Sequence, residues 1–353
     1  MYKSAQKQIL SKTYFTILFF LSFLTAAASL AATTNEEIYL YKGPDRDKRL
    51  VEKAKQEGKV VLYSSIILTD SIPITQAFEK KYGIKVELWR GLADKVVQRT
   101  VSEARANHHA VDVIDTNGPE LEMLAREKLL SEFYSPLFED LPPSAIPAHR
   151  QWIANRFNIW VIAYNTNKIK KEEVPKTYED ILNPKWKGKI GLEATNTEWF
   201  ATLVKTWGEE KGLAYFKKLA DMKPDMRKGH ILLAEMISAG EIPLTLTAYN
   251  HHIEKMKNKG APVEWIPIPP TIARPNGVGV AKHAPHPHAA LLFADFLLSP
   301  DGQDLFRSME RVPSSLKVKT NLNNFPYVMV DPIVILDEWS KWDKLWEDLF
   351  LKK

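Results

Sequence analysis

Apolar positions are concentrated in residues 277–306, GVGVAKHAPHPHAALLFADFLLSPDGQDLF. Its opening residues, 277–281, have the glycine-valine pattern of a short strand. Residues 289–298 are apolar on nearly every side of a helical wheel, which is typical of a helix packed between layers. Ser299 is a preferred N-cap residue and Pro300 suits the first helical position, so a second helix is predicted directly afterwards.

The rest of the chain alternates between short apolar runs and amphipathic segments. The runs contain β-branched residues and end in turn-forming residues, which predicts strands. The segments between them repeat apolar residues every three or four positions, which predicts helices, and the alternation favours α/β layers. The last such segment, 339–349, is predicted to pack its tryptophans into a core. The predicted strands are 59–63, 84–89, 111–114, 158–165, 189–192, 244–247 and 263–268, and the main predicted helices are 46–56, 73–81, 93–106, 212–219 and 231–238.

Four stretches of this pattern resemble a known family. They are GKVVLYSSI with AFEKKYGIKVELWRG (58–91), DVIDTNGPELEMLAREKLL (112–130), VPKTYEDILNPKWKGKIGL (174–192) and FLLSPDGQ (296–303). They are similar to segments of the family 1 extracellular solute-binding proteins of ABC importers, in the branch that contains the ferric-iron binders. The resemblance implies an α/β, two-lobed periplasmic-binding-protein-like fold of type II, in which each lobe is a mixed sheet flanked by helices and two crossing strands join the lobes. The implied divisions are a signal peptide (1–31), the first part of lobe 1 (32–157), lobe 2 (158–273) and the second part of lobe 1 (274–353).

The first residues have the features of a cleaved signal peptide. Lys3, Lys7 and Lys12 form a basic region, residues 14–24 are apolar, and 26–32 are mostly small. The apolar region is shorter than the roughly 20 residues that a membrane span needs. We therefore expect export to the periplasm, with an uncleaved N-terminal anchor as the alternative.

Composition narrows the class of protein further. The formal net charge is +5, and removal of the three signal lysines leaves 5 − 3 = +2, so the mature chain is nearly neutral. We find no nucleic-acid-binding motif and predict no nucleic-acid partner. The sequence contains no cysteine, which excludes a disulfide, a thiolate metal site and a lipid anchor on cysteine. A freely soluble, monomeric periplasmic protein is the expectation.

The predicted topology indicates where a ligand would bind. Ligands of open α/β sheets lie outside the carboxyl ends of the strands, where helices begin. Helix starts have free backbone N–H groups and a favourable dipole, so they suit a carboxylate, a phosphate, a phosphonate or an anion that completes the coordination of a metal. The alternative for each loop is ordinary helix capping; Thr195 and Glu198, for example, have the spacing of a capping box. The four predicted loops are Ser64-Ser65, Thr116-Asn117, Thr195-Asn196 and Gly229-His230.

The resemblance to the ferric-iron branch makes ferric ion one candidate ligand. The ferric-iron branch holds its ion with two neighbouring tyrosines in lobe 2, whereas the corresponding residues here, 247–252, read TAYNHH and retain Tyr249 alone. This departure argues against ferric binding by a tyrosine pair. Tyr249 remains the best single candidate for a ligand-binding residue, with core packing as the alternative.

Two further residue types complete the candidate site. His251 and His252, together with His230, are the candidate metal ligands, although an extended His251-His252 pair would direct its rings to opposite faces. His286 and His288 are expected in a surface connector without a binding role. Arg274, beside the second crossing, is predicted to pair with a carboxylate or phosphonate, or else to be a solvated hinge residue.

These observations predict a periplasmic substrate-binding component of an ABC transporter. It would capture a small solute, ferric iron or an anionic compound, by lobe closure and deliver it to a permease in the inner membrane. No cofactor is expected, and a ferric ion or other metal would be present only as transported ligand. One alternative is a periplasmic sensor that presents its ligand to a receptor. The other is an enzyme on the same scaffold, for which no catalytic motif is found.

Overall fold

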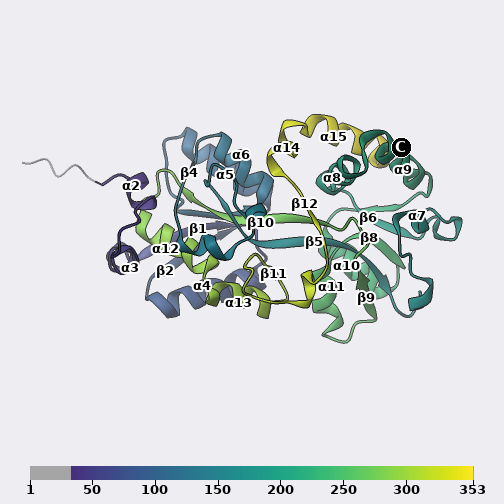
Figure 1. Ribbon diagram of the computed structural model, residues 1–353, viewed down its shortest axis with the longest axis horizontal. Helices are drawn as coiled ribbons and strands as arrows, with labels where there is room; N and C mark the ends of the chain where they lie inside the picture. Colours follow the sequence, from purple (N-terminus) through teal and green to yellow (C-terminus); the bar gives the residue numbers. More distant parts are fainter. Residues whose placement is uncertain (1–32, 353) are drawn as a thin grey trace, which may run out of the picture. The chain divides into compact units, whose positions relative to one another are not determined.

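Two long strands, β5 (Ile153–Asn165) and β10 (Ile272–Ala281), lie side by side at the centre of the strand order, and β5 joins the two halves of the sheet (Figure 1). The computed structural model describes residues 33–352, so the predicted signal peptide lies outside the described residues. All thirteen residues of β5 are buried. Its first half pairs antiparallel with β10 in one sheet, and its second half pairs with β8 and β9 in the other. The two crossing strands and the mixed sheets confirm the predicted two-lobed α/β fold class.

Lobe 1 is built on the sheet β2-β1-β3-β10-β5. Its strands β1, β2 and β3 are parallel, and β10 runs antiparallel to β3. Helix α12 packs on β10 and β1, as expected for a helix with buried residues on all sides. The elements of this lobe are α2 (Asn35–Tyr39), α3 (Arg46–Glu57), β1 (Lys59–Ser64), α4 (Leu68–Tyr82), β2 (Lys85–Arg90), α5 (Ala93–Arg105), β3 (Val113–Asn117), α6 (Gly118–Arg126), β4 (Leu130–Ser131), η1 (Pro136–Asp140), η2 (Pro143–Ala145), α12 (Pro287–Leu298), α13 (Pro300–Ser308) and β11 (Val312–Pro313).

Lobe 2 is built on β8, β6, β7 and β9 around the second half of β5. Helices α10 and α11 pack on this sheet, and α8 packs against α9. The elements of this lobe are η3 (Lys171–Glu173), α7 (Tyr178–Ile181), η4 (Pro184–Trp186), β6 (Ile190–Glu193), α8 (Thr197–Trp207), α9 (Glu209–Asp221), β7 (Asp225–Arg227), α10 (His230–Ala239), β8 (Leu244–Tyr249), α11 (Asn250–Lys257) and β9 (Val263–Ile266).

The C-terminal residues depart from the predicted division of lobes. The sequence places 274–353 entirely in lobe 1, but α15 packs against α8 of lobe 2. Trp342 and Trp346 are buried in the lobe-2 core beside Phe200. The predicted core packing of this helix is confirmed, and its partner is the opposite lobe. The elements of this segment are η5 (Asn321–Asn323), β12 (Val328–Met329), α14 (Pro332–Asp337), α15 (Trp339–Trp346) and the π-helical turn η6 (Glu347–Leu351).

The segment 277–306 folds as its pattern predicts. Ser299 caps α13 by accepting a hydrogen bond from the backbone N–H of Gly302. Strand β10 has an irregularity at Asn276 and Gly277, where a Cβ on Gly277 would collide with the carbonyl oxygen of Ile153. Glycine is therefore required for the close approach of the two crossing strands.

Two local predictions were wrong. Helix α4 begins at Leu68, with Pro73 inside it, rather than near Pro73. His288 lies in the first turn of α12, which begins at Pro287, rather than in the connector, and the imidazoles of His286 and His288 pair with the carboxylates of Asp112 and Glu57 respectively. Among the described residues, no helix has the length and apolar character of a membrane span.

Candidate functional site

The predicted site residues of lobe 2 and the hinge meet where β5 and β10 cross between the lobes. Asn158 of β5 lies opposite Arg274 of β10, and Trp160 of β5 lies opposite Tyr249 at the end of β8. Contacts among their side chains and those of the neighbouring loops create one buried polar group. We call it the crossing cluster; its members are Asn117, Asn158, Trp160, Asn196, Glu198, His230, Tyr249 and Arg274.

Arg274 lies at the centre of this cluster. Its Nη2 donates to Asn117 Oδ1 at 3.2 Å, and its Nη1 lies 3.5 Å from Glu198 Oε1. The guanidinium also lies 5.6 Å from the ring centroids of both Trp160 and Tyr249. Burial alone would lower the pKa of Arg274, but Tyr249 and Glu198 outweigh it and raise that pKa. Arg274 is thus a fixed buried cation, and the alternative of a solvated hinge residue is excluded.

Glu198, in the first turn of α8, is the acidic partner of Arg274. Burial raises the pKa of its carboxyl to about 7, an effect that Arg274 opposes and Glu120 reinforces. The predicted capping box between Thr195 and Glu198 does not form: Thr195 donates instead to Glu193, and the N-cap of α8 is Asn196. The glutamate that the sequence assigned to helix capping therefore faces the arginine.

Tyr249 and His230 form a stacked pair beside the arginine. Their ring centroids are 3.8 Å apart, and the planes are inclined by 27°. Burial, with Arg274 as a second cause, lowers the pKa of His230 to about 3, so the imidazole is neutral. Burial also raises the pKa of Tyr249, although Arg274 opposes this shift. Both rings are therefore uncharged at neutral pH.

Glu193 holds the two lobe-2 loops in position. Its Oε2 accepts hydrogen bonds from the backbone N–H and the hydroxyl of Thr195, both at 2.7 Å. Its Oε1 accepts from the backbone N–H of Gly229 at 2.9 Å. The starts of α8 and α10 are thereby tied to the end of β6, which fixes Asn196 and His230 relative to each other.

The predicted lobe-1 residues are arranged differently. Ser64 Oγ accepts from the backbone N–H of Ile66 at 3.1 Å, and Thr116 donates to Ser65 Oγ at 2.9 Å. Of the four predicted lobe-1 residues, only Asn117 belongs to the crossing cluster, because it accepts a hydrogen bond from Arg274. Ser64, Ser65 and Thr116 thus satisfy local hydrogen-bonding needs.

Five members of the crossing cluster have a buried polar atom without a well-formed hydrogen bond to residues 33–352, although the Asn158 side chain lies close enough to Tyr249 to lower the pKa of that tyrosine. A buried polar atom of this kind costs roughly 1–3 kcal/mol unless something pairs with it. Nine further atoms of this kind lie elsewhere in the described chain, so it is the grouping of five in one cluster that favours a solute here. The five atoms of the cluster are Asn158 Oδ1, Asn196 Nδ2, Glu198 Oε2, Tyr249 Oη and Arg274 Nε.

The helix starts add backbone donors. In the described structure, the N-cap residues of α4, α6, α8 and α10 make no side-chain capping hydrogen bond. Ordinary side-chain capping therefore does not explain Asn117 or Asn196, the two N-cap residues here whose side chains could cap. At α10 one backbone N–H is already used, since Gly229 donates to Glu193.

The histidine pair lies beside the cluster, at the start of α11. The rings of His251 and His252 are 4.2 Å apart, because the pair is helical and not extended. Arg311 Nη1 lies 2.6 Å from His251 Nε2, so this nitrogen accepts from a cation. Burial and Arg311 also lower the pKa of His252 to about 3. No group of three or more His, Asp or Glu in the described residues is placed to hold a metal.

Two members of the cluster, Asn158 and Trp160, were missed by sequence reasoning. Trp160 Nε1 donates to Asn196 Oδ1 at 3.1 Å and so fixes that amide. The signal was present: residues 153–165 (IANRFNIWVIAYN) contain polar side chains inside an apolar strand. Because both faces of β5 are buried, such side chains need polar partners.

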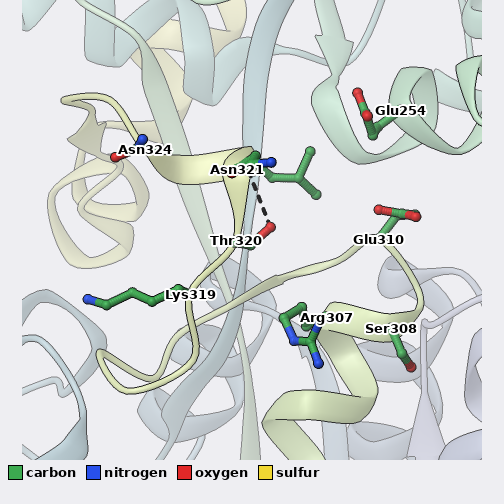
Figure 2. Close-up of a pocket in the computed structure, with 9 residues that line it drawn as sticks. Glu254, Arg307, Ser308, Glu310, Lys319, Thr320, Asn321 and Asn324 are labelled. Atoms are coloured by element: carbon green, nitrogen blue, oxygen red, sulfur yellow. Dashed lines mark hydrogen bonds between the residues drawn. The ribbon is translucent and has the colours of Figure 1, made fainter.

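A separate groove of about 610 Å³ lies on the surface between α11, α13 and the loop 317–324. Figure 2 shows Glu254 and Glu310 on the opposite side of this groove from Lys319 and Asn324. Asn258, the C-cap residue of α11, donates to Glu310 at 2.9 Å, so lobe 2 contacts the lobe-1 segment here. None of the predicted site residues lines this groove.

Comparison with known proteins places the architecture in a family. Residues 110–343 match the family described as bacterial extracellular solute-binding proteins. Iron uptake protein A1 of Synechocystis sp. is 26% identical over 299 residues, which are 80% of this chain and 82% of that protein. Iron-bound HitA from Pseudomonas aeruginosa superposes with a TM-score of 0.72 at 23% identity, over 82% of this chain and 99% of that one. AfuA from Actinobacillus pleuropneumoniae, with exogenous fructose-6-phosphate bound, gives 0.73 at 24% identity, over 84% and 100%.

The two solved structures share the fold, and the family match covers most of both lobes. The predicted resemblance and the predicted role of a substrate-binding component are confirmed at this level. The chain therefore belongs to the bacterial extracellular solute-binding proteins.

Proposed function

We propose that this protein is the periplasmic substrate-binding component of an ABC importer, which closes on a small solute at the crossing cluster and delivers it to an inner-membrane permease. The observation that carries the proposal is the set of five buried polar atoms that lack partners among the described residues. A solute that pairs with these atoms stabilises the closed arrangement of the lobes. Only such differential binding can shift a conformational equilibrium.

Contacts between the lobes support closure. Asp70 of α4 accepts a hydrogen bond from Lys255 of α11 at 3.0 Å and another from Arg311 at 2.7 Å. Burial would raise the pKa of Asp70, but Arg311 and Lys255 outweigh it and lower that pKa. The carboxylate therefore stays ionised and joins the lobes at neutral pH. Hinge closure of this kind needs no chemical step, so we propose a binding protein without turnover.

The names of the similar proteins indicate which classes of solute should be tested. Iron is named for HitA and for iron uptake protein A1, and fructose-6-phosphate for AfuA. Both a metal and an organic anion are therefore reasonable ligand classes to test on this chain. The predicted signal peptide and a relative described as a periplasmic protein support the proposal that the chain is exported to the periplasm.

The test uses the purified mature protein and a panel of ferric citrate, zinc, phosphonates, organic acids and sugar phosphates. A true solute at a hundred times its Kd adds about 2.7 kcal/mol to the free energy of unfolding. Small-angle scattering should show a smaller radius of gyration with that solute. Deletion of the gene should then abolish uptake of the same compound. Binding without any loss of uptake would exclude the importer role.

Two buried tyrosines provide a matched pair of variants. The hydroxyls of Tyr249 and Tyr215 are both buried and lack a partner among the described residues, but Tyr215 lies in the aromatic core with Trp207 and Phe216. Tyr249→Phe should weaken solute binding about tenfold, as expected for one lost hydrogen bond. Tyr215→Phe should leave the Kd unchanged. Equal effects of the two changes would place the solute away from the crossing cluster.

A further inference from the structure

The crossing cluster offers a cation to its solute. Arg274 has five N–H donors, of which one is used by Asn117 and another faces Glu198. Its Nε is buried and has no partner within residues 33–352. A buried guanidinium with spare donors matches a planar carboxylate or a phosphate. Asn196 Nδ2, a second unpartnered donor in the described chain, lies in the same cluster.

The same cluster also offers acceptors. Asn158 Oδ1 and Glu198 Oε2 are buried and receive no hydrogen bond from the described residues. Asn158 lies directly opposite Arg274 in the strand register, and Glu198 pairs with Arg274. The amide oxygen of Asn158 can be satisfied only by a donor, such as a hydroxyl or an ammonium group, and the carboxyl of Glu198 accepts from such a donor when it is ionised. A simple inorganic anion such as phosphate has few donors and would leave these acceptor atoms largely without hydrogen bonds.

The cluster lacks the ligand set of a bare trivalent cation. Its one hard phenolic oxygen belongs to Tyr249, and Arg274 lies over that ring. The carboxylate of Glu193 is already occupied by Thr195 and Gly229, and Glu198 pairs with Arg274. No group of three or more His, Asp or Glu in the described residues is placed to hold a metal, so a bare ferric ion would be under-coordinated here.

From this arrangement we propose that the solute is a small organic anion that also carries hydroxyl or ammonium donors, and not a bare ferric ion. The anionic group pairs with Arg274 and Asn196, while the donors of the same molecule reach Asn158 and Glu198. This inference rests on the proposed function, because it assigns the substrate class of the same site.

The experiment compares four probes by titration calorimetry: fructose 6-phosphate, citrate, inorganic phosphate and ferric nitrilotriacetate. We expect at least one hydroxylated organic anion to bind, and to bind at least tenfold more tightly than inorganic phosphate. Arg274→Gln should weaken that binding about 100-fold, as expected for the loss of one partner of a buried charge pair. Arg274→Lys keeps the positive charge and should weaken binding less. This comparison distinguishes an effect of the lost charge from an effect of misfolding.

Two controls complete the design. Arg227→Gln removes a lobe-2 arginine that pairs with Asp225, outside the cluster, and should leave the Kd unchanged. Glu198→Gln should weaken binding of the hydroxylated anion about tenfold without affecting inorganic phosphate. Thermal unfolding of each variant confirms that it is folded.

The outcomes separate the two proposals. Binding of ferric nitrilotriacetate with an iron–tyrosinate absorption band, lost in Tyr249→Phe and retained in Arg274→Gln, overturns the assignment of the solute and leaves the binding-protein role intact. Binding that is indifferent to Arg274→Gln, Glu198→Gln and Tyr249→Phe alike contradicts both the site and the substrate class. Failure of all four probes, iron included, counts against both proposals.

Discussion

The two lobes contain polar residues at equivalent positions, and they use them differently. In lobe 1, Ser64, Ser65 and Thr116 bond to backbone or to each other. In lobe 2, Asn196 and Tyr249 retain a buried polar atom that no described residue satisfies. The sequence placed Ser64, Ser65, Thr116 and Asn196 in one class, because each lies between a predicted strand and a predicted helix, and Tyr249 was added from the family resemblance. The position of a residue in the topology therefore identifies it as a candidate for the site. Whether its polar atoms are already hydrogen-bonded then distinguishes residues that maintain the fold from residues that are available to a solute.

The buried charges show the same contrast. Arg156 of β5 and Asp115 of β3 pair at 2.9 Å in lobe 1, and Asn155 also donates to the aspartate at 2.7 Å. At the hinge, the Arg274–Glu198 pair is looser, at 3.5 Å, and Arg274 Nε and Glu198 Oε2 both lack a hydrogen bond in the described structure, whereas in the lobe-1 pair only Asp115 Oδ1 does. From the shorter distance and the additional bond from Asn155, we infer that the lobe-1 pair maintains the fold and the hinge pair receives solute.

The largest expected effect is on stability, from the lobe-1 pair. Arg156→Met leaves Asp115 buried and unpaired, which should lower the free energy of unfolding by about 3–5 kcal/mol in urea denaturation. Arg307→Met, which removes an exposed pair with Asp304, is the control and should cost less than about 1 kcal/mol. Similar losses for the two variants would show that burial does not distinguish these pairs.

A somewhat smaller effect concerns pH and Glu198. Its pKa is raised to about 7 from an ordinary value of 4.5, so between these pH values the unfolded chain ionises while the folded chain holds its proton. This group therefore makes the solute-free protein less stable as pH rises from 4.5 to 7, by about 3 kcal/mol in total. The difference in unfolding free energy between wild type and Glu198→Gln should develop over this window. A pH-independent difference would mean that Glu198 is ionised throughout.

The smallest effects come from matched changes in the two lobes. Asn196→Ala should weaken solute binding about five- to tenfold, because one hydrogen bond contributes about 1 kcal/mol. Thr116→Val should cost about 1 kcal/mol of stability and leave the Kd unchanged. If Thr116→Val impairs binding as much as Asn196→Ala, the distinction between the lobes is wrong.

Much of the fold was predictable because its strands and helices are locally encoded. The apolar strand and helix of 277–306 and the cap at Ser299 formed as predicted. The packing partner of 339–349 was not predictable. Its spacing shows which face of the helix is apolar, but not that Trp342 and Trp346 meet the lobe-2 core.

The candidate site was predictable only in part. Tyr249 was identified from the resemblance to the ferric-iron branch and Arg274 from its place beside the second crossing, whereas Asn158 and Trp160 were missed because nothing local marks which residue of a buried strand faces its counterpart. Glu198 was assigned to helix capping, since its spacing from Thr195 fits that role. Arg274, distant in sequence, instead pairs with this carboxylate.

The most direct test is a crystal structure of the mature protein with the solute that it binds most tightly. We predict that the solute contacts Arg274 Nε and the hydroxyl of Tyr249, with Asn158 and Asn196 completing its hydrogen bonds. A solute bound elsewhere, for example in the groove lined by Glu254 and Glu310, with the crossing cluster unchanged, would contradict the account.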